Sequence, residues 1–121
     1  MPFDVTMGQD GILRVELSGD LSNGIVETFR RELTPYVEAA TSSQPLKYIL
    51  LMDQVSQLSP AIRHFLTDLS KDQRLGKTAF VHPSRKARVL GQFMRKAAGP
   101  DKVDFFDQEQ EAIIWLRNSQ G

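Results

Sequence analysis

The chain has 121 residues, equal numbers of basic and acidic residues at 15 each, and no cysteine. Its length fits a single domain over residues 1–121, and its 40% hydrophobic and 25% charged residues exclude a disordered chain. The lack of cysteine excludes a disulfide scaffold, thiol catalysis and cysteine-bound zinc. The chain start lacks the apolar core of a signal peptide, and no apolar run is long enough to span a membrane. We therefore expect a cytoplasmic protein without stable membrane insertion.

The neutral average conceals an uneven distribution of charge. Residues 76–102 contain seven basic residues and one acidic residue, so this segment carries a charge of +6 and the remainder carries −6. Such an asymmetry favours anionic or acidic partners for the basic segment. Because the whole chain is neutral, we expect no binding to nucleic acid.

Hydrophobic periodicity predicts five strands and four helices in the order ββαβαβαβα. Alternation of apolar and polar residues indicates a first strand, and a Gly-rich turn at residues 8–11 joins it to a second in a hairpin. The later alternation of strands with helices favours an α/β fold with a mainly parallel mixed sheet. The predicted strands cover residues 3–7, 12–17, 46–52, 78–81 and 103–106. The expected helix starts are Ser22 or Asn23, Ser59-Pro60, Pro83-Ser84 and Asp107.

This order of elements, at this length, resembles the STAS fold of anti-sigma-factor antagonists, and within it the bacterial SpoIIAA-like branch. The resemblance rests on Gly-Asp-Leu at residues 19–21, on Ile-Leu-Leu-Met-Asp at residues 49–53, and on the tail. The tail reads Val-Asp-Phe-Phe-Asp at residues 103–107 and Glu-Ala-Ile-Ile-Trp-Leu at residues 111–116. The resemblance implies a regulatory or protein-interaction module without catalytic activity.

One segment departs from the pattern of the classical antagonists. Those proteins carry Asp-Ser-Ser-Gly, or a close variant, at the start of the second helix, where an anti-sigma kinase phosphorylates a serine. Residues 55–61 here read Val-Ser-Gln-Leu-Ser-Pro-Ala, so Ala61 falls where the acceptor serine is expected. Ser59 is a nearby hydroxyl, which we interpret as a helix N-cap. The sequence therefore predicts a module without the usual phosphorylatable serine.

Two sets of residues are candidates for binding. The first is a partner surface on the second helix and on a loop expected at residues 54–58, comprising Ser56, Gln57, Ser59 and Arg63. The second is an anion site at the start of the third helix, where a parallel strand ends and free N–H groups attract anions. Its members are His82, Ser84, Arg85, Lys86 and Arg88. Arg85 and Arg88 share one helical face with Gln92 and Arg95, a pattern also typical of an ordinary solvated face.

Two function classes remain open from the sequence. The first is a protein-interaction module, acting as a monomer or a homodimer. The second is a module that binds a small anion or a lipid at the start of the third helix. Neither His64 nor His82 has partners at the spacing that catalysis or a metal site requires, and no nucleotide-binding motif is present. We therefore expect no enzyme activity, no metal and no cofactor.

Overall fold

The structure, a computed structural model, describes residues 3–8, 10–21 and 23–118. The strands are β1 (Phe3–Met7), β2 (Ile12–Leu21), β3 (Leu46–Leu58), β4 (Leu75–Val81) and β5 (Val103–Phe106). The helices are α1 (Val26–Ala39), α2 (Pro60–Ser70), α3 (Arg85–Ala98) and α4 (Glu109–Arg117), and a short 3-10 turn, Asn23–Ile25, precedes α1. The predicted order of elements is confirmed.

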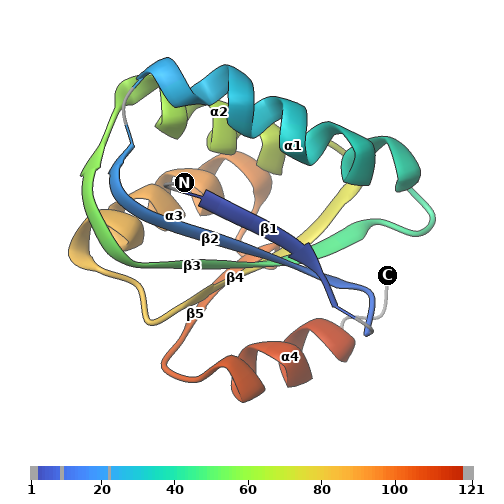
Figure 1. Ribbon diagram of the computed structural model, residues 1–121. Helices are drawn as coiled ribbons and strands as arrows, with labels where there is room; N and C mark the ends of the chain where they lie inside the picture. The colour runs from blue at the N-terminus through green and yellow to red at the C-terminus, as the bar shows by residue number, and fades with distance from the viewer. Residues whose placement is uncertain (1–2, 9, 22, 119–121) are drawn as a thin grey trace.

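The five strands form one mixed sheet in the order β1-β2-β3-β4-β5 (Figure 1). β1 pairs with β2 in an antiparallel hairpin, and the pairs β2–β3, β3–β4 and β4–β5 are parallel. The carboxyl ends of the parallel strands therefore meet at one edge of the sheet, and their amino ends meet at the opposite edge. We call these the carboxyl edge and the amino edge.

The helices divide unequally between the two faces of the sheet (Figure 1). Side chains of α1, α2 and α3 pack on one face, which we call the three-helix face, around fully buried residues such as Phe29, Leu50 and Phe80. The opposite face, the one-helix face, is covered by α4 alone, whose Ala112 and Leu116 pack on a smaller cluster. The larger core on the three-helix face follows from the alternation of buried residues in the strands.

The third strand is longer than the sequence predicted. A strand was predicted at residues 46–52 with a loop at residues 54–58, but β3 continues to Leu58. It is able to continue because β2 also runs further than expected, to Leu21, and pairs with β3 as far as Leu21↔Leu58. Two register shifts in this stretch, together with Gly19 at φ 73°, bend the paired strands. The predicted loop is therefore an extended part of the sheet.

Three other boundaries also differ from the expectations. β4 begins at Leu75 rather than at residue 78, because Leu75 is buried and pairs with Leu46. α4 begins at Glu109 with Gln108 as its N-cap, so the expected cap by Asp107 is wrong. α1 has Ile25 at its N-cap position without a side-chain hydrogen bond, because the 3-10 turn precedes it. Ser22 and the side chain of Asn23 lie outside the described residues.

Candidate partner-binding site

The start of α2 lies at the carboxyl edge, where β3 ends. Ser59 is the N-cap, since its Oγ accepts a hydrogen bond from the backbone N–H of Ile62 at 3.3 Å. Pro60 follows at the first helical position, where its missing N–H costs nothing. The backbone N–H of Ser59 also donates to the carbonyl of Leu21 at 3.0 Å, which ties the helix start to β2. The predicted cap role of Ser59 is confirmed.

The start of α3 lies beside it, after β4. His82 adopts a left-handed conformation with φ 48°, and its backbone N–H donates to the carbonyl of Phe106 at 3.0 Å. This sharp turn directs the chain out of β4 and into the helix. Ser84 is the N-cap, and its Oγ accepts from the N–H of Ala87 at 3.2 Å. The hydroxyl of Ser84 is therefore already used within the helix.

A shallow hollow of about 320 Å³ lies between the two helix starts, and we call it the carboxyl-edge hollow. It is lined by Gln57, Leu58, Arg63, Arg85, Lys86 and Val89. Two residues of the predicted partner surface and two of the predicted anion site therefore line the same hollow, although the sequence treated these sets as separate. His82, Ser84, Ser59 and Arg88 do not line the hollow. Ser56 lies in β3, and its side chain lies outside the described residues.

Among the described side chains that line the hollow, three are cations and none is a carboxylate. The Nε of Arg63 is buried without a hydrogen-bond partner, while its guanidinium lies 5.8 Å from the centre of the Phe93 ring. Arg85 and Lys86 are exposed in the first turn of α3, where the helix dipole disfavours positive charge. The hollow therefore concentrates positive potential that an acidic ligand would relieve.

Exposed apolar side chains continue this surface along α3. Val89 and Phe93 stand one turn apart and are 48% and 50% exposed, respectively. They fall off the buried stripe of the helix, which is formed by Ala87, Leu90, Gly91 and Met94. Sequence reasoning missed Val89 and Phe93, although their offset from that stripe was the available signal. The surface as a whole combines a basic hollow with an apolar ridge.

Two further arginines on α3 are engaged elsewhere. Arg88 and Arg95 both lie over the ring of Phe105 from β5, at 5.6 and 5.5 Å from its centre. Arg95 also donates to the carbonyl of Val103 and to the carboxylate of Asp104. The helical face that the sequence predicted for Arg85, Arg88, Gln92 and Arg95 therefore does not act as one surface. Arg85 lines the hollow, whereas Arg88 and Arg95 pack toward β5.

The two histidines that the sequence singled out are not brought together in the described part of the chain. His64 and His82 are both exposed and lie in different segments. No group of three or more His, Cys, Asp or Glu side chains gathers as metal ligands within that part. Among the described helices, none is long and apolar enough to cross a membrane.

The fold is shared with structures of known anti-sigma factor antagonists. A proposed antagonist from Thermotoga maritima is 15% identical, with a TM-score of 0.71 over 96% of this chain and 95% of that one. SpoIIAA in its unphosphorylated form is 20% identical, with a TM-score of 0.65 over 96% and 98% of the two chains. SpoIIAA from Bacillus in its phosphorylated form is 22% identical, with a TM-score of 0.60 over 93% and 96%. No curated protein matches the sequence.

These structures establish an α/β domain with the STAS fold. The chain belongs to the SpoIIAA-like family, whose model matches residues 12–117. The resemblance seen in the sequence is thereby confirmed.

Proposed function

We propose that this protein is a non-catalytic regulatory module that binds an acidic, partly apolar segment of a partner protein at the carboxyl-edge hollow. The single observation that carries the proposal is the joining of Arg63, Arg85 and Lys86 around one hollow, with no carboxylate among its described lining residues. Carboxylates of a partner would pair with these cations, and guanidinium groups favour such pairing because they donate two parallel hydrogen bonds.

The apolar ridge supports a protein segment over a lone small anion. Val89 and Phe93 are each about half exposed on the same side of α3. A helix or extended segment that carries both acidic and apolar side chains would cover them while its carboxylates reach the hollow. Aromatic and Arg side chains are also the residues that most often dominate binding energy at interfaces.

Binding would not be switched by phosphorylation at the position that the family resemblance indicates. Ala61 has no hydroxyl, and the nearby Ser59 uses its Oγ to cap α2. Incubation with an anti-sigma-type kinase, followed by phosphopeptide mapping, should find no phosphate on residues 59–61. Phosphate on Ser59 in the folded protein would contradict this part of the proposal.

Site-specific photo-crosslinking tests the proposed surface. A photoreactive phenylalanine analogue placed at Phe93 should form an adduct with a specific partner in cells. The same analogue at Ile114, which is 59% exposed on α4, is the matched control and should give no such adduct. The adduct should disappear when Arg63 and Arg85 are both changed to Gln. Equal adducts at Phe93 and Ile114, or persistence in the double variant, would refute the surface.

Binding of a small anion at the start of α3 is a second candidate function. Arg85 and Lys86 support it, since both line the hollow beside the positive end of the helix dipole. Titration with phosphate or sulfate should give saturable NMR shifts at the amides of residues 83–88. These shifts should be lost in the Arg85→Ala/Arg88→Ala protein and weakened by salt. Shifts spread evenly over all basic residues would remove this candidate.

A further inference from the structure

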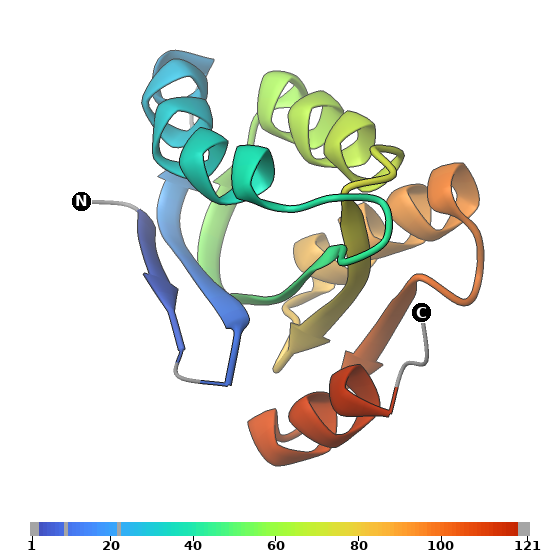
Figure 2. The same ribbon diagram turned by 90° about the vertical axis from the view of Figure 1, so that its right-hand side faces the viewer.

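A second and larger hollow lies at the opposite, amino edge of the sheet. It measures about 560 Å³ and is formed where the chain enters β3, β4 and β5, the edge that faces the viewer in Figure 2. We call it the amino-edge hollow. Its lining residues that carry the argument are Pro45, Lys47, Leu75, Gly76, Lys77, Asp101 and Lys102. Its volume is within the range of small-molecule sites in proteins.

Three of these residues are lysines on neighbouring strands. Lys47 is the second residue of β3, Lys77 is the third residue of β4, and Lys102 directly precedes β5. The β3–β4 register passes from Leu46↔Leu75 to Tyr48↔Thr78, so β4 contains one extra residue opposite Lys47. Such a bulge redirects a side chain, and here it aligns Lys77 with Lys47.

The alternation of the strands places the three lysines on the one-helix face. Side chains an even number of residues apart point to the same face of a strand. The residues that share a face with Lys47, Lys77 and Lys102 pack on the α4 side, and they are Ile49, Ala79 and Phe106, respectively. Neighbouring strands are about 4.8 Å apart, so the three lysines occupy neighbouring positions on one surface. Side-by-side like charges of this kind are destabilising in a sheet.

Few acidic side chains act on this row within the described residues: Asp101 lines the hollow, and the Asp72 carboxylate interacts electrostatically with Lys102. None of the ion pairs found there involves Lys47, Lys77 or Lys102. Asp101 is the single carboxylate among the lining residues, so the described hollow retains a charge of about +2. The ammonium of Lys77 is instead 4.7 Å from the centre of the Trp115 ring.

The rest of the hollow is suited to the apolar part of a ligand. Pro45 and the buried Leu75 contribute apolar surface beside the row. Gly76 allows the chain before β3 to pack closely here, because a Cβ at this position would lie only 3.3 Å from the carbonyl oxygen of Leu46 and from the Cβ of Pro45. A few convergent polar groups beside apolar surface are the usual composition of a small-molecule site.

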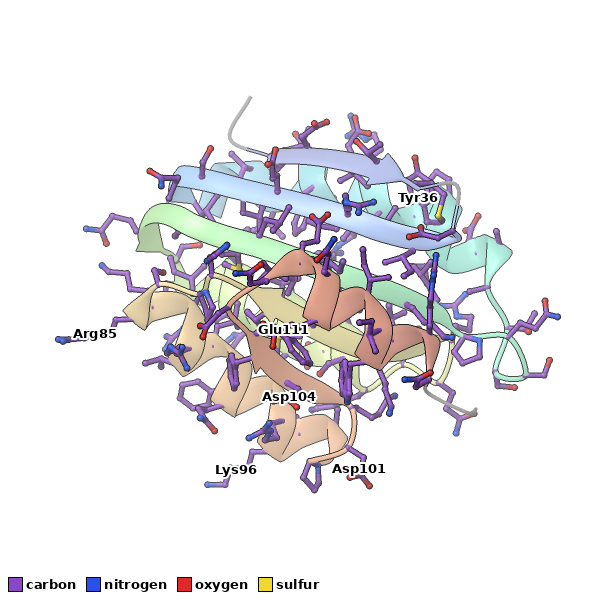
Figure 3. The ribbon with its side chains drawn as sticks, turned by 90° about the horizontal axis from the view of Figure 1, so that it is seen from below. Tyr36, Arg85, Lys96, Asp101, Asp104 and Glu111 are labelled. Carbon is purple, nitrogen blue, oxygen red and sulfur yellow. The ribbon has the colours of Figure 1, made fainter. Side chains whose placement is uncertain are left out.

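We infer that the amino-edge hollow binds a small organic dianion, namely a phosphate ester, with its phosphate among the three lysines and its apolar part against Pro45 and Leu75. The charge of the phosphate matches the surplus of the hollow and relieves the repulsion within the row. This site shares no lining residue with the carboxyl-edge hollow, so it can be tested independently of the proposed partner binding. Figure 3 shows the separation, with Arg85 at the start of α3 and Asp101 just beyond the other end of that helix.

Trp115 provides a built-in reporter for this inference. It is the only tryptophan of the chain, and its ring contacts the Lys77 ammonium that would move toward the phosphate. Titration with hexyl phosphate should give a saturable change in Trp115 emission, together with NMR shifts at the amides of residues 46–47, 76–77 and 101–102. Inorganic phosphate should bind more weakly, and hexanol should produce no response.

A charge-matched pair of variants locates the site. Lys47→Gln/Lys102→Gln keeps the Lys77–Trp115 reporter and should weaken hexyl phosphate binding ~10-fold or more, as expected for losing charged hydrogen bonds. Arg31→Gln/Lys96→Gln removes the same charge from exposed positions on α1 and α3 and should leave the affinity unchanged. An equal loss in both variants, a response to hexanol, or no saturable change would each overturn the inference.

Vesicles distinguish the two sources of a phosphate ester. Vesicles of phosphatidylcholine with and without phosphatidic acid are compared with soluble hexyl phosphate. Tighter binding to phosphatidic acid, lost in the Lys47→Gln/Lys102→Gln protein, would assign the ligand as a lipid headgroup. Tighter binding to hexyl phosphate would assign it as a soluble ester. Vesicle binding that survives in this variant would overturn the site.

Discussion

The two faces of the sheet are built from the same strands but differ in how much of them is covered. The three-helix face is packed by α1, α2 and α3. Its buried residues come from all five strands. The one-helix face is covered by α4 over a small cluster that includes Ile12, Ile49 and Ala79. The part beyond α4 carries the lysine row and the amino-edge hollow.

This difference separates stability from binding within one domain. The three-helix face holds most of the apolar burial, which dominates the free energy of folding. The one-helix face is held by fewer apolar contacts and by the ion pair between Arg14 of β2 and Glu109 of α4. We therefore expect substitutions on the first face to change mainly stability, and those on the exposed part of the second to change mainly binding.

The largest expected effect compares two neighbouring leucines on β3. Leu50 is fully buried on the three-helix face, whereas Leu51 is half-buried against the α4 side. Leu50→Ala should lower the free energy of unfolding by ~2–5 kcal/mol because it leaves a cavity. Leu51→Ala should cost below ~2 kcal/mol because part of the removed side chain is already exposed. Urea unfolding measures both, and an equal or larger loss for Leu51→Ala would contradict the comparison.

The second prediction concerns the tight packing of α3 on the three-helix face. Gly91 faces the sheet, and a Cβ there would overlap the ring of Phe105 and lie 3.2 Å from Cε1 of Phe80. In an exposed helix Gly→Ala stabilises, but here we expect Gly91→Ala to cost ~1–3 kcal/mol through overpacking. The exposed neighbour Gln92→Ala is the control and should change stability by less than ~0.5 kcal/mol. A gain in melting temperature for Gly91→Ala would show that α3 has room to move.

The sequence predicted the fold well wherever local patterning decides it. Alternation identified the β1–β2 hairpin, and Leu13, Val15 and Leu17 are all buried together as expected. The length of β3 could not be predicted in this way, because its second half mixes polar residues such as Gln54 and Gln57 with buried Val55. That half is a strand because β2 pairs with it, and such pairing is a property of two distant segments.

The candidate site was predicted only in pieces. Arg63 and Arg85 were assigned to different sets because they lie in different helices, and only the adjacency of β3 and β4 in the sheet brings the helix starts together. Arg88 was assigned to the anion site, because its contact with Phe105 of β5 could not be predicted from the helix alone. The lysine row was missed for the same reason, since it depends on the register of three strands.

The third prediction tests how α4 is held on the one-helix face. Arg14 donates to Glu109 through Nε at 3.2 Å and Nη2 at 2.8 Å, and this hydrogen bonding lowers the pKa of the Glu109 carboxyl. Both side chains are partly exposed, so solvent screening limits the expected cost of Glu109→Gln to ~0.2–1 kcal/mol. Glu111→Gln on the exposed side of α4 is the control and should have less effect (Figure 3).

The same pair predicts a pH dependence with a definite sign. A carboxyl whose pKa is lower in the folded state binds fewer protons there than in the unfolded state, so its contribution is present at neutral pH. That contribution is lost as the pH falls below the ordinary Glu value of ~4.3 and through the lowered folded value. The difference in melting temperature between wild type and Glu109→Gln should therefore shrink from pH 7 to pH 3. A constant difference would mean that the pair does not hold α4.

The smallest expected effect separates the lysine row from the structural contacts around it. Lys47 lies between Ile12 of β2 and the bulge of β4, and it has no ion pair among the described residues. Lys47→Gln removes one member of a repelling set, so stability should stay constant or rise by up to ~0.5 kcal/mol. Lys77→Gln should instead cost ~0.5–1 kcal/mol, because it loses the cation–π contact with Trp115.

Salt sharpens this last test, because added salt weakens repulsion between exposed charges, with a Debye length of about 10 Å at 0.1 M. The wild type should gain stability on addition of salt, and Lys47→Gln should gain less. Thermal unfolding at low and moderate ionic strength measures the difference, with Lys96→Gln on the exposed side of α3 as the control. A loss of more than ~1 kcal/mol in Lys47→Gln would place this lysine among the residues that hold the fold. It would then belong to the same category as Arg14 and Glu109, and the division between a stabilising face and a binding face would fail at this edge.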